Sequence, residues 1–336
     1  MSPSKAKDIL ESELTSPKGH IETKDFLIDF FGGEPLLNFD LIREVSEWLW
    51  SKNWKYPYKL RIRTNGTLLN DEMRRWFSEH KKQIELALSL DGLGEMQKGN
   101  RTEIIPDAHF FMENWPGVRA KMVVFPDTVH FLADAIKGMR QEGIPFEIEI
   151  GSGFFWSIEK ARQLEQQLDS LIPLYVQDMN EAFESKLFPT ALANLFPDNP
   201  PSKYPFCGCV SNIVAYDVDG TSYCCHMFTP VVLGEALAKQ ALCLCESARE
   251  CDIDEQCRSC PLVDCCRLCY GDNLRVCGDL SKSAALKTTC NAVKAMGRST
   301  AKLFLESLRI RAKRKIHISE NEPEVAEKAL KLLKKQ

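Results

Sequence analysis

The first 206 residues of this 336-residue chain contain no cysteine, although the chain has 14 cysteines in all. The sequence also lacks a run of about 18 apolar residues, the minimum for a membrane-spanning helix. No apolar signal region follows Met1, because Asp8, Glu11 and Glu13 come within its first turns. These absences argue against a spanning or exported protein, and we expect a cytoplasmic chain without a membrane partner.

Positive charge is also in short supply, since the net charge is -4. A surface built to bind phosphates carries an excess of lysine and arginine, so no nucleic-acid partner is expected. The chain has neither an internal repeat nor a low-complexity tract. Its length suffices for two ordinary domains with hydrophobic cores, and 44% hydrophobic and 27% charged residues are typical of a globular protein.

All the cysteines lie between Cys207 and Cys290, most densely in the stretch from Cys257 to Cys269. Thiolates this close together must be bridged, metallated or kept reduced, because they repel one another and oxidise readily. A reducing cytosol does not maintain disulfides, and a chain of this size does not need them. The pattern therefore favours metal or cluster ligation over disulfides.

Short apolar segments alternate with amphipathic helical segments through the first 150 residues. Such alternation predicts parallel βαβ units and an α/β barrel, or part of one. Residues 156–200 are predicted to be a helical linker, and a hairpin turns at Asp217-Val-Asp-Gly220. The predicted strands span 26–31, 59–64, 84–90, 119–125 and 146–150, and helices are predicted at 5–14, 161–171, 294–314 and 322–335.

Polar residues end three successive predicted strands. These strand ends are Gly32-Gly33-Glu34-Pro35, Thr64-Asn65-Gly66 and Ser89-Leu90-Asp91-Gly92. The carboxyl ends of parallel strands share one edge, which is where barrel folds place their chemistry. We therefore expect one site at this edge.

These strand ends, together with the cysteine pattern, resemble the radical S-adenosylmethionine superfamily, in particular its members with a C-terminal SPASM domain. The resemblance covers about residues 20–105 and 207–290 and implies a partial (β/α)6 barrel with a small cysteine-rich domain. It also implies that Gly32, Gly33 and Glu34 meet the amino group of S-adenosylmethionine, within a cofactor-binding set that includes Pro35, Thr64 and Asn65. Ser89, Asp91 and, as a further candidate, Arg101 are implied to bind its ribose and carboxylate.

The resemblance extends to two sets of cluster ligands. Asp219-Gly220-Thr-Ser-Tyr223-Cys224-Cys225 matches the D-G-x-x-Y-x-C turn of the SPASM pattern, which favours Cys225 over Cys224. The implied ligands of one auxiliary [4Fe–4S] cluster are Cys207, Cys225 and Cys269, with Cys209 as a further candidate. Those of a second cluster are Cys257, Cys260, Cys266 or Cys265, and Cys290.

The identity of the metal and of some ligand cysteines has alternatives. Zinc is the alternative to iron and sulfide, since C-x2-C pairs also suit tetrahedral Zn²⁺. Spacing does not decide between Cys265 and Cys266, and four cysteines fit no position of the pattern: Cys243, Cys245, Cys251 and Cys277.

One departure from the family is large. Its catalytic cluster is held by C-x3-C-x2-C after the first barrel strand, and neither that motif nor that strand is found here. We therefore expect that the polypeptide does not cleave S-adenosylmethionine alone. A misplaced start, a partner chain that supplies the missing segment, or a catalytically silent barrel would each explain the pattern. S-adenosylmethionine is expected as a cofactor only if that segment is supplied.

The predicted domains are a partial barrel (1–155), the linker (156–200), a SPASM-like cluster domain (201–290) and C-terminal helices (291–336). The predicted function is that of an iron–sulfur protein related to maturases that modify ribosomally made peptides or protein side chains. His226 is the candidate catalytic side chain, as a base or a ligand, at a position where sulfatase maturases have an aspartate. The alternative is a non-enzymatic, metal-stabilised peptide-binding or partner protein.

Overall fold

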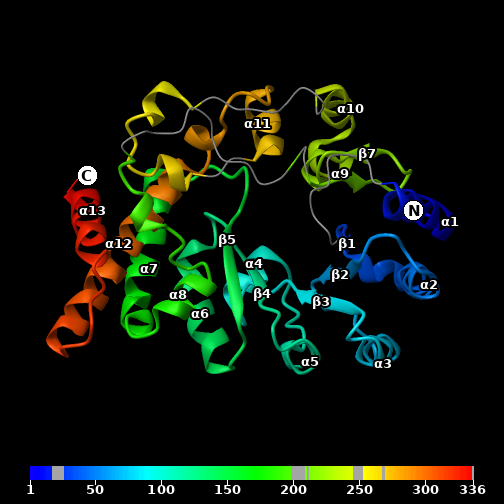
Figure 1. Ribbon diagram of the computed structural model, residues 1–336, viewed down its shortest axis with the longest axis horizontal. Coiled ribbons are helices and arrows are strands. Elements are labelled where there is room, and N and C mark those ends of the chain that lie inside the picture. Colours follow the sequence, from blue (N-terminus) through cyan, green and yellow to red (C-terminus); the bar gives the residue numbers. More distant parts are fainter. Residues whose placement is uncertain (17–25, 198–208, 210–211, 245–252, 267–268, 335–336) are drawn as a thin grey trace.

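The computed structural model describes residues 1–16, 26–197, 209, 212–244, 253–266 and 269–334 (Figure 1). In its first half, strands alternate with helices, as the sequence predicts. The elements are α1 (Pro3–Thr15), β1 (Phe26–Phe30), η1 (Pro35–Asn38), α2 (Phe39–Trp50), β2 (Tyr58–Thr64), α3 (Asp71–Glu79), β3 (Ile84–Leu88), α4 (Glu95–Asn100), α5 (Ala108–Asn114), β4 (Ala120–Val124), η2 (Val129–Phe131), α6 (Leu132–Gln141), β5 (Phe146–Ile150), α7 (Ile158–Tyr175), α8 (Met179–Glu184) and η3 (Leu192–Asn194).

The strands of this half form two parallel sheets that meet at one edge. One has the order β1-β2-β3 and the other is the pair β4-β5. A bridge between Ser89 and Lys121 joins them, and the Leu90 N–H donates to the Lys121 carbonyl at 3.0 Å. The chain is therefore a mixed α/β protein with parallel strands joined through helices. Closure of these strands into part of a barrel stays a prediction.

The two faces of β2 differ in chemistry. Leu60, Ile62 and Thr64 are buried, and the two aliphatic side chains belong to the same hydrophobic core as side chains of α2 and α3. Arg61 and Arg63 alternate with them and are half-buried. Because successive side chains of a strand point to opposite faces, the arginines lie on the face away from these helices.

The segment predicted as a linker is in large part core. Leu164, Leu168 and Leu171 of α7 have no exposed surface and form one stripe of the helix. Helix α12 (Cys290–Lys313) packs along α7, and both contribute to the core of the first half. Residues 158–175 therefore belong to the packed structure and do not form a spacer.

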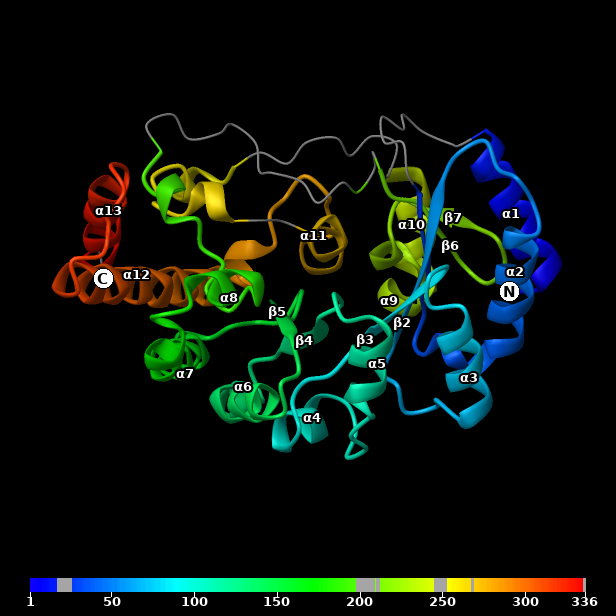
Figure 2. The same ribbon diagram turned by 60° about the horizontal axis from the view of Figure 1, so that its bottom comes forward.

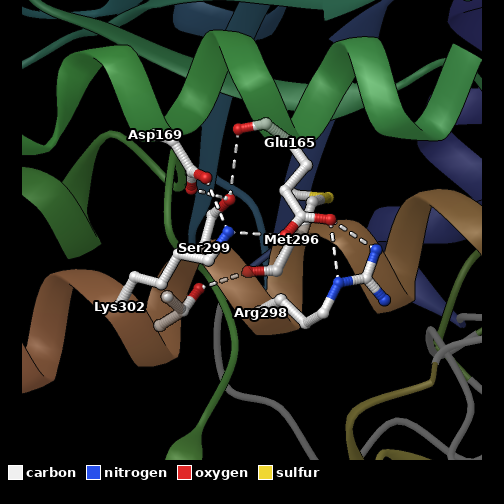
Figure 3. Close-up of polar contacts among 7 residues, drawn as sticks. Glu165, Asp169, Met296, Arg298, Ser299 and Lys302 are labelled. Carbon is white, nitrogen blue, oxygen red and sulfur yellow. Dashed lines mark hydrogen bonds and ion pairs between the residues drawn. The ribbon is translucent and has the colours of Figure 1, made fainter. Parts of the chain in front are cut away.

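Polar contacts hold α12 to α7 (Figure 3). The carboxylate of Glu165 accepts from Arg298 Nε at 2.8 Å and from Lys302 Nζ at 2.6 Å. One turn further along α7, Asp169 accepts from Ser299 Oγ at 2.7 Å and from the same Lys302 nitrogen at 2.6 Å. Burial raises the pKa of Glu165, but the hydrogen bonds from Arg298 and Lys302 outweigh it, so that this pKa lies below its ordinary value.

The second half consists of short elements with a small hydrophobic core of its own, centred on residues such as Tyr223, Phe228 and Leu274. The predicted hairpin is confirmed, with Ala215 paired to Tyr223 and a turn at Gly220, whose φ is +91°. The elements are β6 (Ala215–Tyr216), β7 (Ser222–Tyr223), η4 (His226–Phe228), α9 (Pro230–Leu233), α10 (Glu235–Leu244), η5 (Glu255–Cys257), η6 (Val263–Cys265), α11 (Tyr270–Cys277), η7 (Ala285–Lys287), α12 and α13 (Glu322–Lys334).

The two halves contact each other at both ends of the strand array (Figure 2). At one end, Lys5 Nζ of α1 donates to the carbonyl of Asp219 at 2.7 Å. At the other end, Trp156 N–H donates to the carbonyl of Thr288 at 2.9 Å, and Asn291 Nδ2 donates to the Trp156 carbonyl at 2.9 Å. The cysteine-rich half is thereby fixed against the first half.

The C-terminal helix α13 packs on α12 through Ala329 and Leu332, which are buried beside Leu262. Within the described ranges, no helix combines the length and the apolar character that a membrane crossing demands.

We predict that Glu165→Gln lowers the free energy of unfolding by about 1.5–3 kcal/mol, since two cations lose a charged acceptor. Chemical denaturation at neutral pH measures this change. Because the folded-state pKa of Glu165 is depressed, its contribution is present above the pKa of the unfolded carboxyl and is lost as the pH falls through the folded value. The matched control is Glu306→Gln, which removes an exposed pair with Arg309 and should leave the unfolding curve unchanged. Equal curves for the two variants would contradict the role given to Glu165.

Candidate functional site

The carboxylate of Glu34 ties the ends of the first two strands together. It accepts from Thr64 Oγ1 at 2.7 Å, from the Asn65 N–H at 2.9 Å and from the Leu36 N–H at 3.1 Å. The Gly66 N–H in turn donates to Thr64 Oγ1 at 2.9 Å, with Gly66 at φ +74°. Two of the strand ends predicted to lie together are therefore joined directly.

The turn that carries Glu34 is open to a ligand. Gly32 and Gly33 are exposed, and no atom lies within 4 Å of where a Cβ would stand on either glycine. Pro35 begins the short η1 helix, where its missing N–H costs nothing. The backbone of this turn can therefore approach a bound molecule closely, as the predicted cofactor site requires.

The third strand end is organised by a fully buried carboxylate. Asp91 has no exposed surface, and its oxygens accept from Arg101 Nε at 2.7 Å, from the Val123 N–H at 2.7 Å and from Asn100 Nδ2 at 3.2 Å. The sequence suggested Asp91 and Arg101 as separate cofactor contacts, whereas the structure joins them in an ion pair. Arg101, with 24% of its side chain exposed, and Ser89, with 8% of the residue exposed, keep some access to solvent.

Three cysteines of the first predicted set that lie within the described residues are Cys209, Cys225 and Cys269. The Cys225 thiol accepts from the Met227 N–H at 3.4 Å and lies 3.7 Å from His226 Nδ1. A hydrogen bond from the Cys209 thiol, together with His226, lowers the pKa of Cys225 to about 4. Cys207 lies outside the described residues. Cys224 is disulfide-bonded, which differs from the expectation of unbridged cysteines but leaves Cys225 as the ligand candidate of that pair.

Cys269 stands at the N-terminal end of α11, and its electrostatic environment includes Cys225. Burial and the charge of Asp272 raise the pKa of Cys269 to about 11. Gly271 follows in the first turn of the helix, and a Cβ there would lie 2.6 Å from that of Met227. The loop of Cys269 therefore packs directly against the segment that carries Cys225.

The second predicted set surrounds one pocket. Cys265 lies outside it, because its thiol donates to the Ala191 carbonyl at 3.7 Å. Burial, with the charges of neighbouring cysteines, raises the pKa of Cys266 to about 12. Four cysteines line the pocket, namely Cys257, Cys260, Cys266 and Cys290, beside the apolar side chains of Leu262, Val263, Ala285, Leu286 and Val293 and that of Lys294.

Cys266 lines this pocket together with the other three cysteines, and Cys265 does not. Which of the two is a ligand stays a prediction. Cys277 also lies elsewhere, with its thiol donating to the Ser283 carbonyl at 3.7 Å. The side chains of Cys243, Cys245 and Cys251 fall outside the described part of the chain. Among the described side chains, no three or more His, Cys, Asp or Glu residues lie close enough together to hold one metal ion between them.

Two residues without a predicted role, Asp29 and Phe31, lie beside the candidate His226 where the two halves meet at β1. The ring of His226 contacts that of Phe31 at 4.6 Å between centroids. Burial raises the pKa of Asp29 on β1, although Arg61, Arg63 and His226 all lower it. The signal in the sequence is the single charge of Asp29 inside the apolar run 26–31, a position without a predicted role.

The halves also meet beyond β5. The Ser152 hydroxyl donates to Asp272, which pairs with Arg275 at 3.0 Å. Gly153 has φ +72°, and a Cβ on it would collide with the guanidinium of Arg275. The two contacts place the cysteine-rich half beside residues that follow the first and last described strands of the parallel array.

Among known proteins, no family model matches the chain. An uncharacterized protein of Methanocaldococcus jannaschii is 36% identical over 66 residues, which are 20% of this chain and 22% of that protein. The chain thus matches under a quarter of this curated relative's length.

Solved structures match over far more of the chain. The structure of anSMEcpe with AdoMet and the Cp18Cys peptide aligns with a TM-score of 0.59, 15% identity and coverage of 93% of this chain and 92% of that one. The complex with AdoMet and the Kp18Cys peptide aligns with a TM-score of 0.61 and 14% identity, over 92% of this chain and 91% of that one. The chain has the fold of anSMEcpe. The complex with AdoMet alone aligns with a TM-score of 0.60 and 15% identity, over 92% of this chain and 91% of that one. At this identity the likeness to anSMEcpe concerns the fold.

We predict that Asp91→Asn lowers the free energy of unfolding by about 2–3 kcal/mol. This loss is smaller than that for a fully buried ion pair, because Arg101 is partly exposed. The control is Asp40→Asn on α2, whose side chain is 87% exposed and whose loss should cost far less. Chemical denaturation compares the two. An Asp91→Asn variant that unfolds at the same denaturant concentration as the unmodified chain would contradict this structural role.

Proposed function

We propose that this chain is a radical S-adenosylmethionine/SPASM-type iron–sulfur protein that acts on a peptide or protein side chain. The observation that carries the proposal is the pairing of two features on one fold: three joined strand ends that leave an open glycine turn, and two groups of cysteines in the half that packs beside them. The fold is shared with anSMEcpe, whose solved structures hold AdoMet and peptides. A coincidence of all three is improbable for a purely structural protein.

The cysteine groups fit the proposed clusters. A cluster of the [4Fe–4S] type is held by four thiolates in a largely apolar pocket, and hydrogen bonds to sulfur and burial tune it. The pocket at Cys257, Cys260, Cys266 and Cys290 provides this donor set. Cys207, Cys225 and Cys269, with Cys209 as a further candidate, form the other group. When bound, such clusters supply substrate ligation or electron transfer, while the protein fixes their position.

The open turn fits the proposed cofactor. Carbonyl oxygens at the Gly32-Gly33 turn can accept hydrogen bonds from an ammonium group, because no side chain shields them. Arg101 can donate to a carboxylate, since its guanidinium has a free edge beyond its pair with Asp91. Glu34 contributes mainly by holding the turn, because most of its lone pairs are already used.

The proposal includes a limit on activity. Residues 1–206 contain no thiolate that could hold a radical-generating cluster. We propose that residues 1–336 alone do not cleave S-adenosylmethionine, and that the missing ligands come from a further segment or a partner chain. The second candidate function follows from the same observation: a non-enzymatic peptide-binding or partner protein, stabilised by clusters or by zinc.

We predict that the protein, purified without air, contains iron and acid-labile sulfide, and that Cys257→Ser with Cys260→Ser removes about half of both. The reason is that the two serines break one ligand set and leave the other intact. Iron, sulfide and zinc analyses of matched samples make the measurement. Cys277→Ser is the control. The Cys277 thiol lies outside both cysteine groups, so the iron and sulfide content of this variant should equal that of the unmodified chain. Zinc without sulfide in the unmodified chain would overturn the cofactor assignment.

A further inference from the structure

Three polar groups beside β1 and β2 lack a hydrogen-bond partner within the described residues, namely the Arg63 guanidinium and the buried atoms Asp29 Oδ1 and Arg61 Nε. They lie on the polar face of β1–β3, which we define by Asp29, Arg61, Arg63 and Glu85. This face looks away from α2 and α3, since the alternate residues Leu60 and Ile62 are buried against those helices. It therefore borders the space between the two halves of the molecule.

The inner part of this face is already paired. Arg61 Nε lies 3.3 Å from Asp29 Oδ2, and Arg61 Nη1 lies 4.0 Å from Glu85 Oε1. One arginine thus serves both carboxylates across adjacent strands. Side chains at registered positions of neighbouring strands commonly pair in this way.

The outer part of this polar face, around Arg63, is not paired. Within the described residues, the guanidinium of Arg63 makes no hydrogen bond and no ion pair. The Asp29 Oδ1 atom is buried and also lacks a hydrogen-bond partner. The two lie close enough for Arg63 to lower the pKa of Asp29, but they are not joined. A buried acceptor without a donor costs free energy, so a ligand that donates to it is favoured.

Charge decides which ligand fits. Arg63 lies beside the opposite charge of Asp29, so that an added anion gains little from Arg63. A neutral group with a donor and an acceptor side by side satisfies both Arg63 and Asp29 at once. One residue of an extended peptide is such a group, because its own N–H and C=O point to the same side of the chain, the carbonyl toward Arg63 and the N–H toward Asp29.

The surroundings are those of a substrate site. Phe31, two residues beyond Asp29, is 51% exposed and contacts the ring of His226. His226 follows Cys225, one of the proposed cluster ligands. An extended peptide held here would place an adjacent side chain beside Phe31, between the glycine turn and that cysteine.

We propose that Arg63 and Asp29 together bind the main chain of one extended residue of the substrate, Arg63 through its carbonyl oxygen and Asp29 through its N–H. This inference rests on the proposed function, because it names how a peptide substrate is held at that site. It adds a specificity for uncharged backbone over a free terminus or an acidic side chain.

The test compares Arg63→Met with Arg61→Met. Arg63 has no internal partner, so Arg63→Met should leave thermal unfolding and iron content unchanged. Arg61→Met strands Asp29 and Glu85 and should lower the melting temperature. The probe is a pool of random octapeptides with blocked termini, incubated with the anaerobically purified full chain and quantified by mass spectrometry after filtration.

We predict that Arg63→Met retains the blocked pool at least about tenfold less than the unmodified chain, as expected for the loss of a charged hydrogen bond. The same pool with N-methylated backbones should be retained poorly by both proteins. Equal retention by the two proteins would overturn the proposal. So would a preference for an unblocked pool that Arg63→Met abolishes, because it would assign Arg63 to a terminal carboxylate. Iron and sulfide analyses of the same samples separate the two claims: their absence overturns the proposed function, whereas equal retention of the blocked pool by a protein that contains both overturns this inference alone.

Discussion

A single buried carboxylate, that of Asp91, holds the two sheets of the first half together at their carboxyl ends. It bonds to Arg101 at the end of α4 and to the N–H of Val123 on β4, so that three elements converge on one group. Next to it, the Ser89–Lys121 bridge continues the parallel array, and the Thr64 carbonyl accepts from the Ser89 N–H at 2.8 Å. With Glu34 bonded to Thr64, all three strand ends are fixed in one row. A site on such a frame is pre-organised, because its side chains need not be ordered when a ligand binds.

The cysteine groups relate to this frame in different ways. Cys225 lies beside His226, which contacts Phe31 directly after β1. The pocket of Cys266 lies at the opposite end, where Cys290 begins α12, and α12 is anchored to α7 by Glu165 and Asp169. One group is thus placed to face the proposed substrate, and the other is built into the contact between the two halves. In the proposed function the first suits substrate binding, while the second suits electron transfer or support of the fold.

Much of the architecture could be predicted from the sequence. The strand predicted at 146–150 and the helix predicted at 322–335 are strongly periodic, and their bounds agree with the structure to within one residue. The linker predicted at 156–200 stays a prediction as a domain boundary, but the packing of its helix could not be predicted, because periodicity shows that Leu164, Leu168 and Leu171 share a stripe but not what covers it. The cover is α12, more than a hundred residues further along the chain.

The site was predictable only at the level of motifs. Spacing could not separate Cys265 from Cys266, since adjacent residues differ in direction and not in position along the chain. The partnership of Asp91 with Arg101, and the unpaired state of Arg63, depend on three-dimensional neighbours that no local pattern records. Beyond its charge, Asp29 has no local signal of a site, because a single charge within an apolar run is compatible with a strand buried on both faces.

Native mass spectrometry of the anaerobically purified chain tests the central claim most directly, because it reads the bound inorganic mass on the intact protein. The account predicts a folded species heavier than the polypeptide by two [4Fe–4S] clusters. A folded species that carries only zinc, or no metal at all, would contradict it.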